Sequence, residues 1–199
     1  MAPLKYGRKS GYLRHLQALA LLRIGRLNRF AGPAPAYPGG RTIFVCKGNI
    51  ARSAYAEYRA RALGMSGLAS AGVMADSGHP ANPDAVTVGW KRGVYLGNHA
   101  SRHVDELALR PLDRVFAFEI EHARQLAETT PARVFLLGLW AEPVRPYIED
   151  PFNRPLAFYD QCFGIIDNAL ERLWQEDLTD RPATEELAPA VPDQVKISG

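Results

Sequence analysis

Cys46 and Arg52 lie six positions apart in the segment Cys46-Lys-Gly-Asn-Ile-Ala-Arg-Ser53. The residues before this segment, 41–45, form a short apolar run rich in β-branched side chains, which predicts a buried strand. The residues after it, 54–63, predict a helix that ends at Gly64. We therefore expect the cysteine in a strand–loop–helix turn, at the N-terminus of the helix.

This position favours an anion site that contains a nucleophile. Loop amides and the helix dipole attract an anion to a helix N-terminus, and the same field favours a thiolate over a thiol. A planar guanidinium can bind a tetrahedral oxyanion through two parallel hydrogen bonds. The alternative is a buried cysteine with an incidental arginine nearby. We predict phosphoryl transfer through a phosphocysteine, with Cys46 as nucleophile and the phosphate bound by six residues: Lys47, Gly48, Asn49, Ile50, Ala51 and Arg52.

The reaction also needs an acid, because a phenolic oxygen that leaves phosphorus must gain a proton. Asp150 is the candidate, since Pro151 follows it and biases its backbone toward an extended conformation. Glu149 is an alternative acid, and a plain Asp-Pro turn without a catalytic role is the other interpretation. Asn49 is suited to a left-handed backbone in the loop, and Ser53 is suited to cap the helix that follows.

These residues resemble the signature of the low-molecular-weight protein tyrosine phosphatases, Cys-x-Gly-Asn-Ile-Cys-Arg-Ser-Pro. Three further segments resemble motifs of that family in the same order: Ser70-Ala-Gly72, His99-Ala-Ser-Arg102 and Asp150-Pro-Phe152. The resemblance covers Arg41 to about Asp177. It implies that Ser70 and His99 hold the side chain of Asn49, and that Ser53 donates a hydrogen bond to the leaving thiolate. It also implies a metal-independent protein tyrosine phosphatase that uses no cofactor.

The chain departs from the family pattern at several positions. Ala51 stands where relatives often have a second cysteine, so a protective disulfide beside the nucleophile is not available. The acidic residue that follows the third strand in relatives aligns with Glu119. We expect Phe152 as the apolar wall of the pocket, and Asp76 and Asn153 at wall positions that are apolar or aromatic in relatives. These changes bear on substrate preference rather than on the type of reaction.

The loop of residues 70–84 is short, as in the bacterial subgroup that dephosphorylates tyrosine kinases of exopolysaccharide export. Ile50 is similar to the phosphotyrosine enzymes, because relatives that act on phosphoarginine tend to carry threonine there. The resemblance thus implies a phosphotyrosine protein as partner, an autophosphorylating kinase among the candidates. Three other functions stay open: arsenate reduction, for which Cys162 is the only additional cysteine; a non-catalytic phosphotyrosine-binding module; and phosphate release from nucleotides or sugars.

The chain has 199 residues, enough for one α/β domain with extensions. Four strands are expected, at residues 42–45, 68–70, 114–118 and 134–137, and further helices at 82–92, 120–128 and 156–175. This alternation predicts a four-stranded parallel doubly wound sheet, phosphotyrosine phosphatase I-like, with helices on both faces and the phosphate-binding loop after strand one. The two distant cysteines argue against a disulfide scaffold or a Cys-x2-Cys zinc site, and Cys162 is expected in the core.

We divide the chain into an extension at 1–40, a phosphatase domain at 41–177 and a flexible tail at 178–199. The extension carries seven basic and no acidic residues in a chain of net charge +3, and residues 12–30 are helix-prone before a Pro/Gly linker. Its apolar run, residues 16–22, is too short and too closely flanked by arginine to span a membrane, and the extension lacks the order and cleavage site of a signal peptide. Three interpretations of the extension stay open: it binds an anionic membrane surface, it docks on the domain or a partner, or it is disordered. No motif supports nucleic-acid binding, and the nucleophilic thiol suggests the cytoplasm.

Overall fold

A computed structural model of the protein describes residues 9–179, which contain one four-stranded sheet with the strand order β2-β1-β3-β4. All neighbouring strands are parallel. The strands are β1 (Thr42–Cys46), β2 (Leu68–Gly72), β3 (Arg114–Ala117) and β4 (Arg133–Leu136). Each lies within two residues of its expected bounds, and the predicted parallel α/β fold is confirmed.

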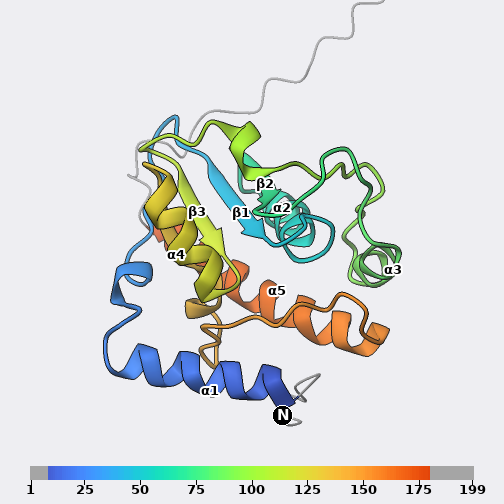
Figure 1. Cartoon of the computed structure of the whole chain (residues 1–199). Coiled ribbons are helices and arrows are strands. Elements are labelled where there is room, and N and C mark those ends of the chain that lie inside the picture. The colour runs from blue at the N-terminus through green and yellow to red at the C-terminus, as the bar shows by residue number, and fades with distance from the viewer. Residues whose placement is uncertain (1–8, 180–199) are drawn as a thin grey trace, which may run out of the picture.

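Helices cover both faces of this sheet (Figure 1). Alternate strand residues point to opposite faces, so one face presents three aromatic side chains in register: Phe44, Phe116 and Phe135. They pack in one core with three helices: α2 (Arg52–Ala62), α3 (Pro83–Lys91) and α5 (Leu156–Thr179). The other face presents Ile43, Val115 and Val134 to a second core, which includes residues of α4 (Ile120–Thr129).

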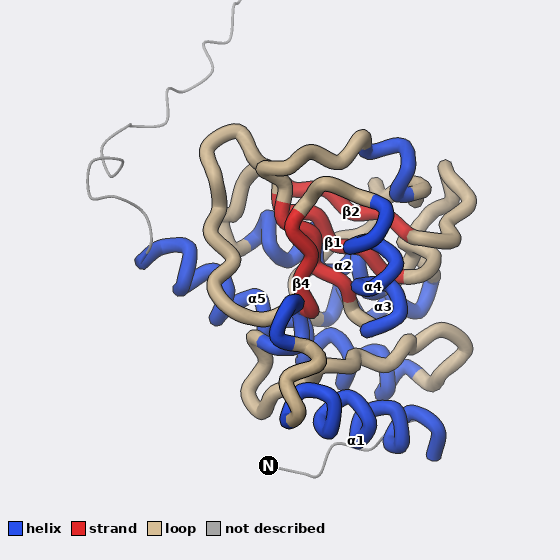
Figure 2. The backbone as a smooth tube through the Cα atoms, turned by 60° about the vertical axis from the view of Figure 1, so that its left-hand side comes forward, coloured by secondary structure: helices blue, strands red, loops and turns tan. Residues whose placement is uncertain are grey.

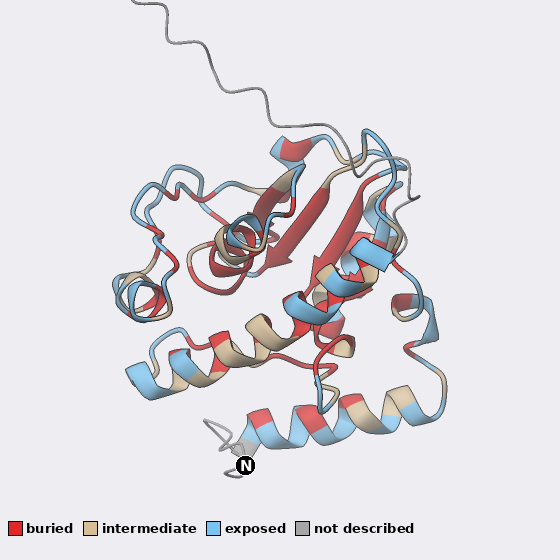
Figure 3. Cartoon of the chain, turned by 180° about the vertical axis from the view of Figure 1, so that it is seen from behind, coloured by how far each residue is buried: buried red, intermediate tan, exposed pale blue. Residues whose placement is uncertain are grey.

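The N-terminal extension folds as helix α1 (Lys9–Arg23), followed by a short 3-10 helix η1 (Asn28–Phe30). The helix-prone run ends early because Gly25 has a positive φ of 74°, and the Arg26 amide donates to the Leu21 carbonyl across it. The loop that leads from β4 to α5 passes between α1 and α5 (Figures 1 and 2). One face of α1 is buried toward the domain and the opposite face is exposed (Figure 3).

At its C-terminal end, α5 continues to Thr179, so the first two residues of the expected tail are helical. The rest of that tail, 180–199, lies outside the described residues, as do residues 1–8. Within the part of the chain that the structure describes, no helix has both the length and the apolar character needed to cross a membrane.

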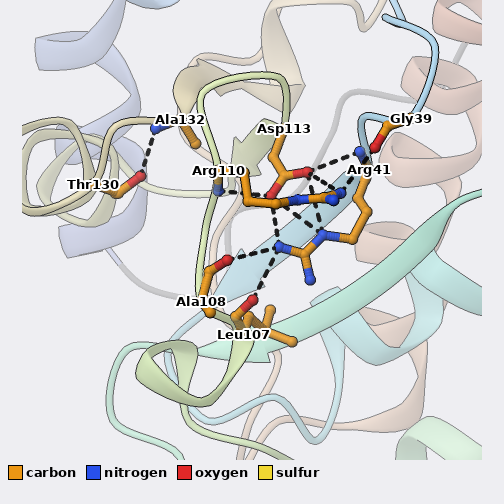
Figure 4. Close-up of polar contacts among 8 residues, drawn as sticks. All are labelled: Gly39, Arg41, Leu107, Ala108, Arg110, Asp113, Thr130 and Ala132. Atoms are coloured by element: carbon orange, nitrogen blue, oxygen red, sulfur yellow. Dashed lines mark hydrogen bonds and ion pairs between the residues drawn. The ribbon is translucent and has the colours of Figure 1, made fainter.

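A buried carboxylate, Asp113, ties the amino ends of β1 and β3 together (Figure 4). Its oxygens accept hydrogen bonds from the backbone and guanidinium of Arg41 and from the backbone and guanidinium of Arg110. Burial alone would raise the pKa of Asp113, but these donors hold it well below its ordinary value. The Arg41 guanidinium also donates to the carbonyls of Leu107 and Ala108. This cluster lies at the end of the sheet opposite Cys46.

Candidate active site

The loop from Cys46 to Ser53 curls at the carboxyl end of β1, and Arg52 is the first residue of α2. Asn49 adopts the expected left-handed backbone, with φ of 54°. Gly72 of β2 allows the loop to approach closely, because a Cβ there would lie 2.5 Å from the Lys47 carbonyl oxygen. Cys46 is nearly fully buried.

The carbonyl groups of the loop bond outward to the surrounding chain. The Lys47 carbonyl accepts a hydrogen bond from the Met74 amide, and the Asn49 carbonyl accepts one from His99 Nε2. The carbonyls of Ile50 and Ala51 accept from the amides of Asn82 and Tyr55, respectively. The N–H and C=O of a trans peptide point in opposite directions. The amides that follow these carbonyls are therefore turned toward the inside of the loop, where an oxyanion can accept from them.

The side chain of Asn49 is fully buried and holds the loop in shape. Its Nδ2 donates to Ser53 Oγ and to Ser70 Oγ, each at 2.9 Å, and its Oδ1 accepts from the Arg102 amide at 2.9 Å. His99 was also expected at this side chain, but its Nε2 lies 2.6 Å from the main-chain carbonyl of Asn49. The difference arises because Ser53, Ser70 and Arg102 already occupy the amide group.

His99 is buried, and burial lowers the pKa of its ring. A neutral ring that carries its proton on Nε2 donates to the Asn49 carbonyl, which fits the observed contact. His99 thus supports the backbone of the loop rather than the side chain of Asn49.

Glu57 is a supporting residue that the sequence reasoning missed. Its Oε2 accepts from Ser70 Oγ at 2.6 Å, and its Oε1 accepts from Arg61 at 2.7 Å. Because Ser70 gives its proton to Glu57, Ser70 can only accept from Asn49, which fixes the direction of the Asn49 amide. A signal was available, since Glu57 and Ser53 are four residues apart and share one face of α2.

Ser53 Oγ accepts from Asn49 and lies 3.0 Å from Cys46 Sγ and 3.2 Å from the Ala71 carbonyl. Its own proton is thus directed to one of those two acceptors. The contact with the sulfur is the one that the family resemblance implies for this serine.

Arg52 is fully buried beneath the pocket. Its Nη1 donates to Glu119 Oε1 at 2.8 Å and to the Ile148 carbonyl at 2.9 Å. Burial disfavours the charged guanidinium, but the carboxylates of Asp150 and Glu119 outweigh it and raise the pKa of Arg52 above its ordinary value. Its Nε and Nη2 form no hydrogen bond with the described residues, although Nη2 lies 2.9 Å from Asp150 Oδ2. This edge of the guanidinium can bind two oxygens of a phosphate side by side.

A pocket of about 200 Å³ opens above the loop. Asp150 stands at its wall with a side chain that is 36% exposed, and its Oδ1 accepts from the Phe152 amide. Eight residues line the pocket: Cys46, Lys47, Gly48, Ile50, Ala51, Met74, Asp150 and Phe152. The structure therefore brings the expected nucleophile, acid, loop residues and apolar wall together around one space.

Two expected wall residues, Asp76 and Asn153, do not line this pocket, and Met74 does. The Met74 amide donates to the Lys47 carbonyl, which holds this residue at the edge of the loop. Asp76 comes two residues later in an exposed turn, where its carbonyl accepts from Ser101. Asn153 is exposed in a left-handed turn with φ of 58°. The pocket lining thus contains a second apolar side chain, Met74, in place of the two polar ones that were expected.

The other residues weighed from the sequence lie outside the pocket. Glu149 is not a lining residue, and its carboxylate is 3.0 Å from Arg154. Cys162 is buried in the first core, where burial raises the pKa of its thiol. Its sulfur is 3.7 Å from the Glu149 carbonyl. Neither side chain is placed to act on a ligand in the pocket.

Comparison with known proteins gives a consistent result. The family model described as low molecular weight phosphotyrosine protein phosphatase matches residues 41–183. The low molecular weight protein-tyrosine-phosphatase Etp of Escherichia coli K12 is 32% identical over 142 residues, which are 69% of this chain and 93% of Etp.

Solved structures of similar proteins cover the same part of the chain. The tyrosine phosphatase Wzb from Escherichia coli K30, in complex with sulphate, has a TM-score of 0.62 at 29% identity, over 69% of this chain and 97% of Wzb. The YwlE arginine phosphatase from Geobacillus stearothermophilus has a TM-score of 0.61 at 25% identity, over 72% of this chain and 98% of that one.

Proposed function

The chain belongs to the low molecular weight phosphotyrosine protein phosphatase family, and from this membership we propose the roles of its site residues and the kind of protein on which it acts. It is a metal-independent, cysteine-dependent hydrolase of phosphotyrosine. A single observation carries the proposed roles. The Nε and Nη2 atoms of Arg52 are buried next to the pocket that contains Cys46, and they form no hydrogen bond with the described residues.

In the first step, the Cys46 thiolate attacks phosphorus in line with the leaving phenolic oxygen. Arg52 and the inward-turned amides of the loop bind the other three oxygens as charge builds on them. The S–P bond forms as the P–O bond to the phenol breaks. Ser53 stabilises the sulfur as thiolate before the attack and again when it leaves.

Asp150 gives its proton to the phenolic oxygen as that bond breaks. Asp150 Oδ2 lies 2.9 Å from Arg52 Nη2, so the acid stands beside the group that binds the phosphate. In the second step, the ionised Asp150 takes a proton from water, which attacks phosphorus and releases phosphate and the Cys46 thiolate.

The shape of the pocket supports an aryl phosphate. Met74 and Phe152 both line the pocket and offer apolar surface to the ring of phosphotyrosine. Ile50 also lines the pocket, at the position where relatives that act on phosphoarginine tend to carry threonine. We infer an autophosphorylating tyrosine kinase of polysaccharide export as the partner, on the basis of Ile50 and the short loop of residues 70–84.

We further propose that the protein works in the cytoplasm and that α1 attaches it peripherally to an anionic membrane. Leu13, Leu16 and Ile24 are exposed on α1 and just after it, and Arg23 and Arg26 are exposed nearby. An apolar face flanked by arginines suits the headgroup region. We expect the protein to sediment with phosphatidylglycerol vesicles but not with phosphatidylcholine vesicles. A protein that sediments with neither kind of vesicle would contradict this proposal.

The activity test uses p-nitrophenyl phosphate near pH 6 in the presence of a chelator, with the wild type and Cys46→Ser. We expect activity in the wild type and none in the variant, because a serine hydroxyl is not ionised at this pH. A folded, reduced wild type without activity would favour the binding-module alternative. Peptides that carry phosphotyrosine or phosphoarginine then test the substrate, and preference for phosphoarginine would overturn the assignment to tyrosine.

A further inference from the structure

Helix α1 precedes the residues that the family model matches, yet it contacts the segment that leads to Asp150. We call residues 145–150 the acid segment. His15 is buried, 4% exposed, with Nε2 3.1 Å from Arg145 Nη1. The guanidinium of Arg14 lies over the ring of Tyr147, 5.9 Å from its centre. Gly11 packs against Glu149, because a Cβ on this glycine would lie 2.1 Å from Glu149 Oε2.

These contacts fall on every second residue of the acid segment, which is the pattern of an extended chain between two surfaces. Residues 145, 147 and 149 meet α1. Ile148 and Asp150 face the catalytic loop: the Ile148 carbonyl accepts from Arg52, and Asp150 forms the ion pair with Arg52. The two hydrophobic cores show the same alternation: Tyr147 packs in the second core, which contains Ala18 of α1, and Ile148 packs in the first core, which contains Cys46.

The helix also reaches the carboxylate that holds Arg52. Glu119 Oε1 accepts from Arg52 Nη1 at 2.8 Å, and Glu119 Oε2 lies 4.0 Å from Arg14 Nη1. The side chain of Arg14 is more than half exposed, so this second ion pair is weak. It nevertheless shows that α1 lies beside both the acid segment and Glu119, the residue that holds Arg52.

We propose that α1 positions the general acid of this enzyme, with Gly11, Arg14 and His15 as positioning residues that support the acid segment from behind. The inference rests on the proposed role of Asp150. Catalytic groups must be held close to their reactive geometry, and a small displacement of an acid reduces proton transfer steeply. The acid segment has no strand neighbour of its own in the sheet, so α1 supplies the second surface that fixes it.

A helix that only stabilises the fold would have a different effect from one that positions an acid. Protonation matters more for a more basic leaving oxygen, so a misplaced acid slows phenyl phosphate more than p-nitrophenyl phosphate. A loss of folded protein lowers both rates by the same factor. The ratio of kcat/KM for the two substrates therefore isolates the positioning effect.

The test compares Ala18→Glu with Ala20→Glu in the full chain. Ala18 is fully buried in the second core, whereas Ala20 is exposed two residues further along the same helix. A buried glutamate should separate α1 from the domain, and the same residue at position 20 should not. We expect the kcat/KM ratio of p-nitrophenyl to phenyl phosphate to rise about tenfold in Ala18→Glu, part of the full effect of a general acid, and to stay unchanged in Ala20→Glu.

Asp150→Asn separates this inference from the proposed function. If Asp150→Asn leaves the ratio unchanged, Asp150 is not the acid and the proposed mechanism fails. If Asp150→Asn raises the ratio and Ala18→Glu does not, the mechanism stands and the role of α1 is refuted. Adding Ala18→Glu to Asp150→Asn should not raise the ratio further, because the acid is already absent.

A second variant covers the case in which Ala18→Glu does not fold. Gly11→Ala introduces a methyl group that must displace the Glu149 carboxylate, while alanine favours the helix itself. We expect a higher kcat/KM ratio of p-nitrophenyl to phenyl phosphate, with no loss of thermal stability. An unchanged ratio in folded Gly11→Ala would overturn the proposal.

Discussion

The polar side chains around the catalytic loop form a directed chain from Glu57 to Cys46. Ser70 donates to Glu57, Asn49 donates to Ser70 and to Ser53, and Ser53 keeps a proton for the sulfur or a carbonyl. Each donor has an acceptor, so the geometry of the loop does not depend on substrate. This arrangement preorganises the amides that bind phosphate.

Asn49→Ala and Ser70→Ala should lower kcat/KM by different amounts. Asn49→Ala removes three side-chain hydrogen bonds and places a residue that resists left-handed backbone at φ of 54°. At about 1 kcal/mol for each bond, we expect a loss of about 100-fold or more for Asn49→Ala and about 30-fold for Ser70→Ala, which removes two bonds. Steady-state kinetics with p-nitrophenyl phosphate measure both values. Equal losses would show that the amide of Asn49 adds nothing beyond its bond to Ser70.

The sequence predicted these residues well where their positions follow from local rules. Cys46 and Arg52 belong to one strand–loop–helix turn, and Ser70 lies in the neighbouring strand, so parallel pairing brings them together. Phe152 was placed correctly at the pocket wall, but Asp76 was wrong, because Asp76 and Met74 differ by two positions in an irregular turn that no periodicity describes. His99 was placed at the right loop but on another atom, since the hydrogen-bonding capacity of the Asn49 amide is a property of the folded site.

At the scale of elements, helix α1 shows what charge and hydropathy could and could not tell. The seven basic residues of the extension and the apolar run of α1 were compatible with a membrane, a partner or the domain itself, because all three surfaces satisfy the same pattern. The choice of surface depends on the acid segment, about 130 residues away, and on small residues, Gly11 and Ala18, that let the helix approach it. Gly25, in contrast, is a local signal for the end of the helix.

The docking of α1 should weaken as pH falls. Burial, together with the charge of Arg145, lowers the pKa of His15 to about 4 from its ordinary value near 6.5. The docked helix therefore favours neutral His15, and this contribution is fully present above about pH 6.5 and decreases as pH falls toward 4. We expect lower hydrogen-exchange protection in residues 9–23 at pH 5 than at pH 7.5, after correction for intrinsic exchange rates.

His15→Asn provides the control for this pH effect, because asparagine does not titrate in this range. Protection of α1 in the variant should be similar at the two pH values. If the wild type shows no loss of protection at pH 5, His15 is not held neutral by docking.

At the scale of the whole molecule, the sheet separates catalysis from stability. The phosphate-binding loop, the acid segment and α1 lie at the carboxyl ends of the strands, as expected for parallel α/β sheets. Asp113 and its arginines lie at the opposite ends of β1 and β3. The alternation of strands and helices predicted this layout, whereas the Asp113 cluster depends on contacts between Arg41 and a residue 72 positions away, which no local pattern reveals.

Asp113→Asn should reduce stability and leave catalysis intact. The carboxylate is fully buried and neutralises Arg41, whose side chain is 27% exposed, so its loss leaves a partly buried charge unpaired. Removing one partner of a buried ion pair costs several kcal/mol, and partial exposure reduces this figure, so we expect a loss of about 2 kcal/mol in the free energy of unfolding at pH 7. Urea denaturation measures it, and kcat/KM should be unchanged because the site lies at the other end of the sheet.

The acid dependence of unfolding tests the same carboxylate independently. Because the pKa of Asp113 is lower in the folded protein than its ordinary value near 3.9, its stabilisation is present above that value and is lost as pH falls through the folded pKa. Wild-type stability should therefore fall more steeply below pH 4 than that of Asp113→Asn. Arg110→Ala is the matched control, since its side chain is 53% exposed and its backbone bond to Asp113 remains. If Arg110→Ala destabilises the protein as much as Asp113→Asn, the surface arginine rather than the buried carboxylate joins the two strands.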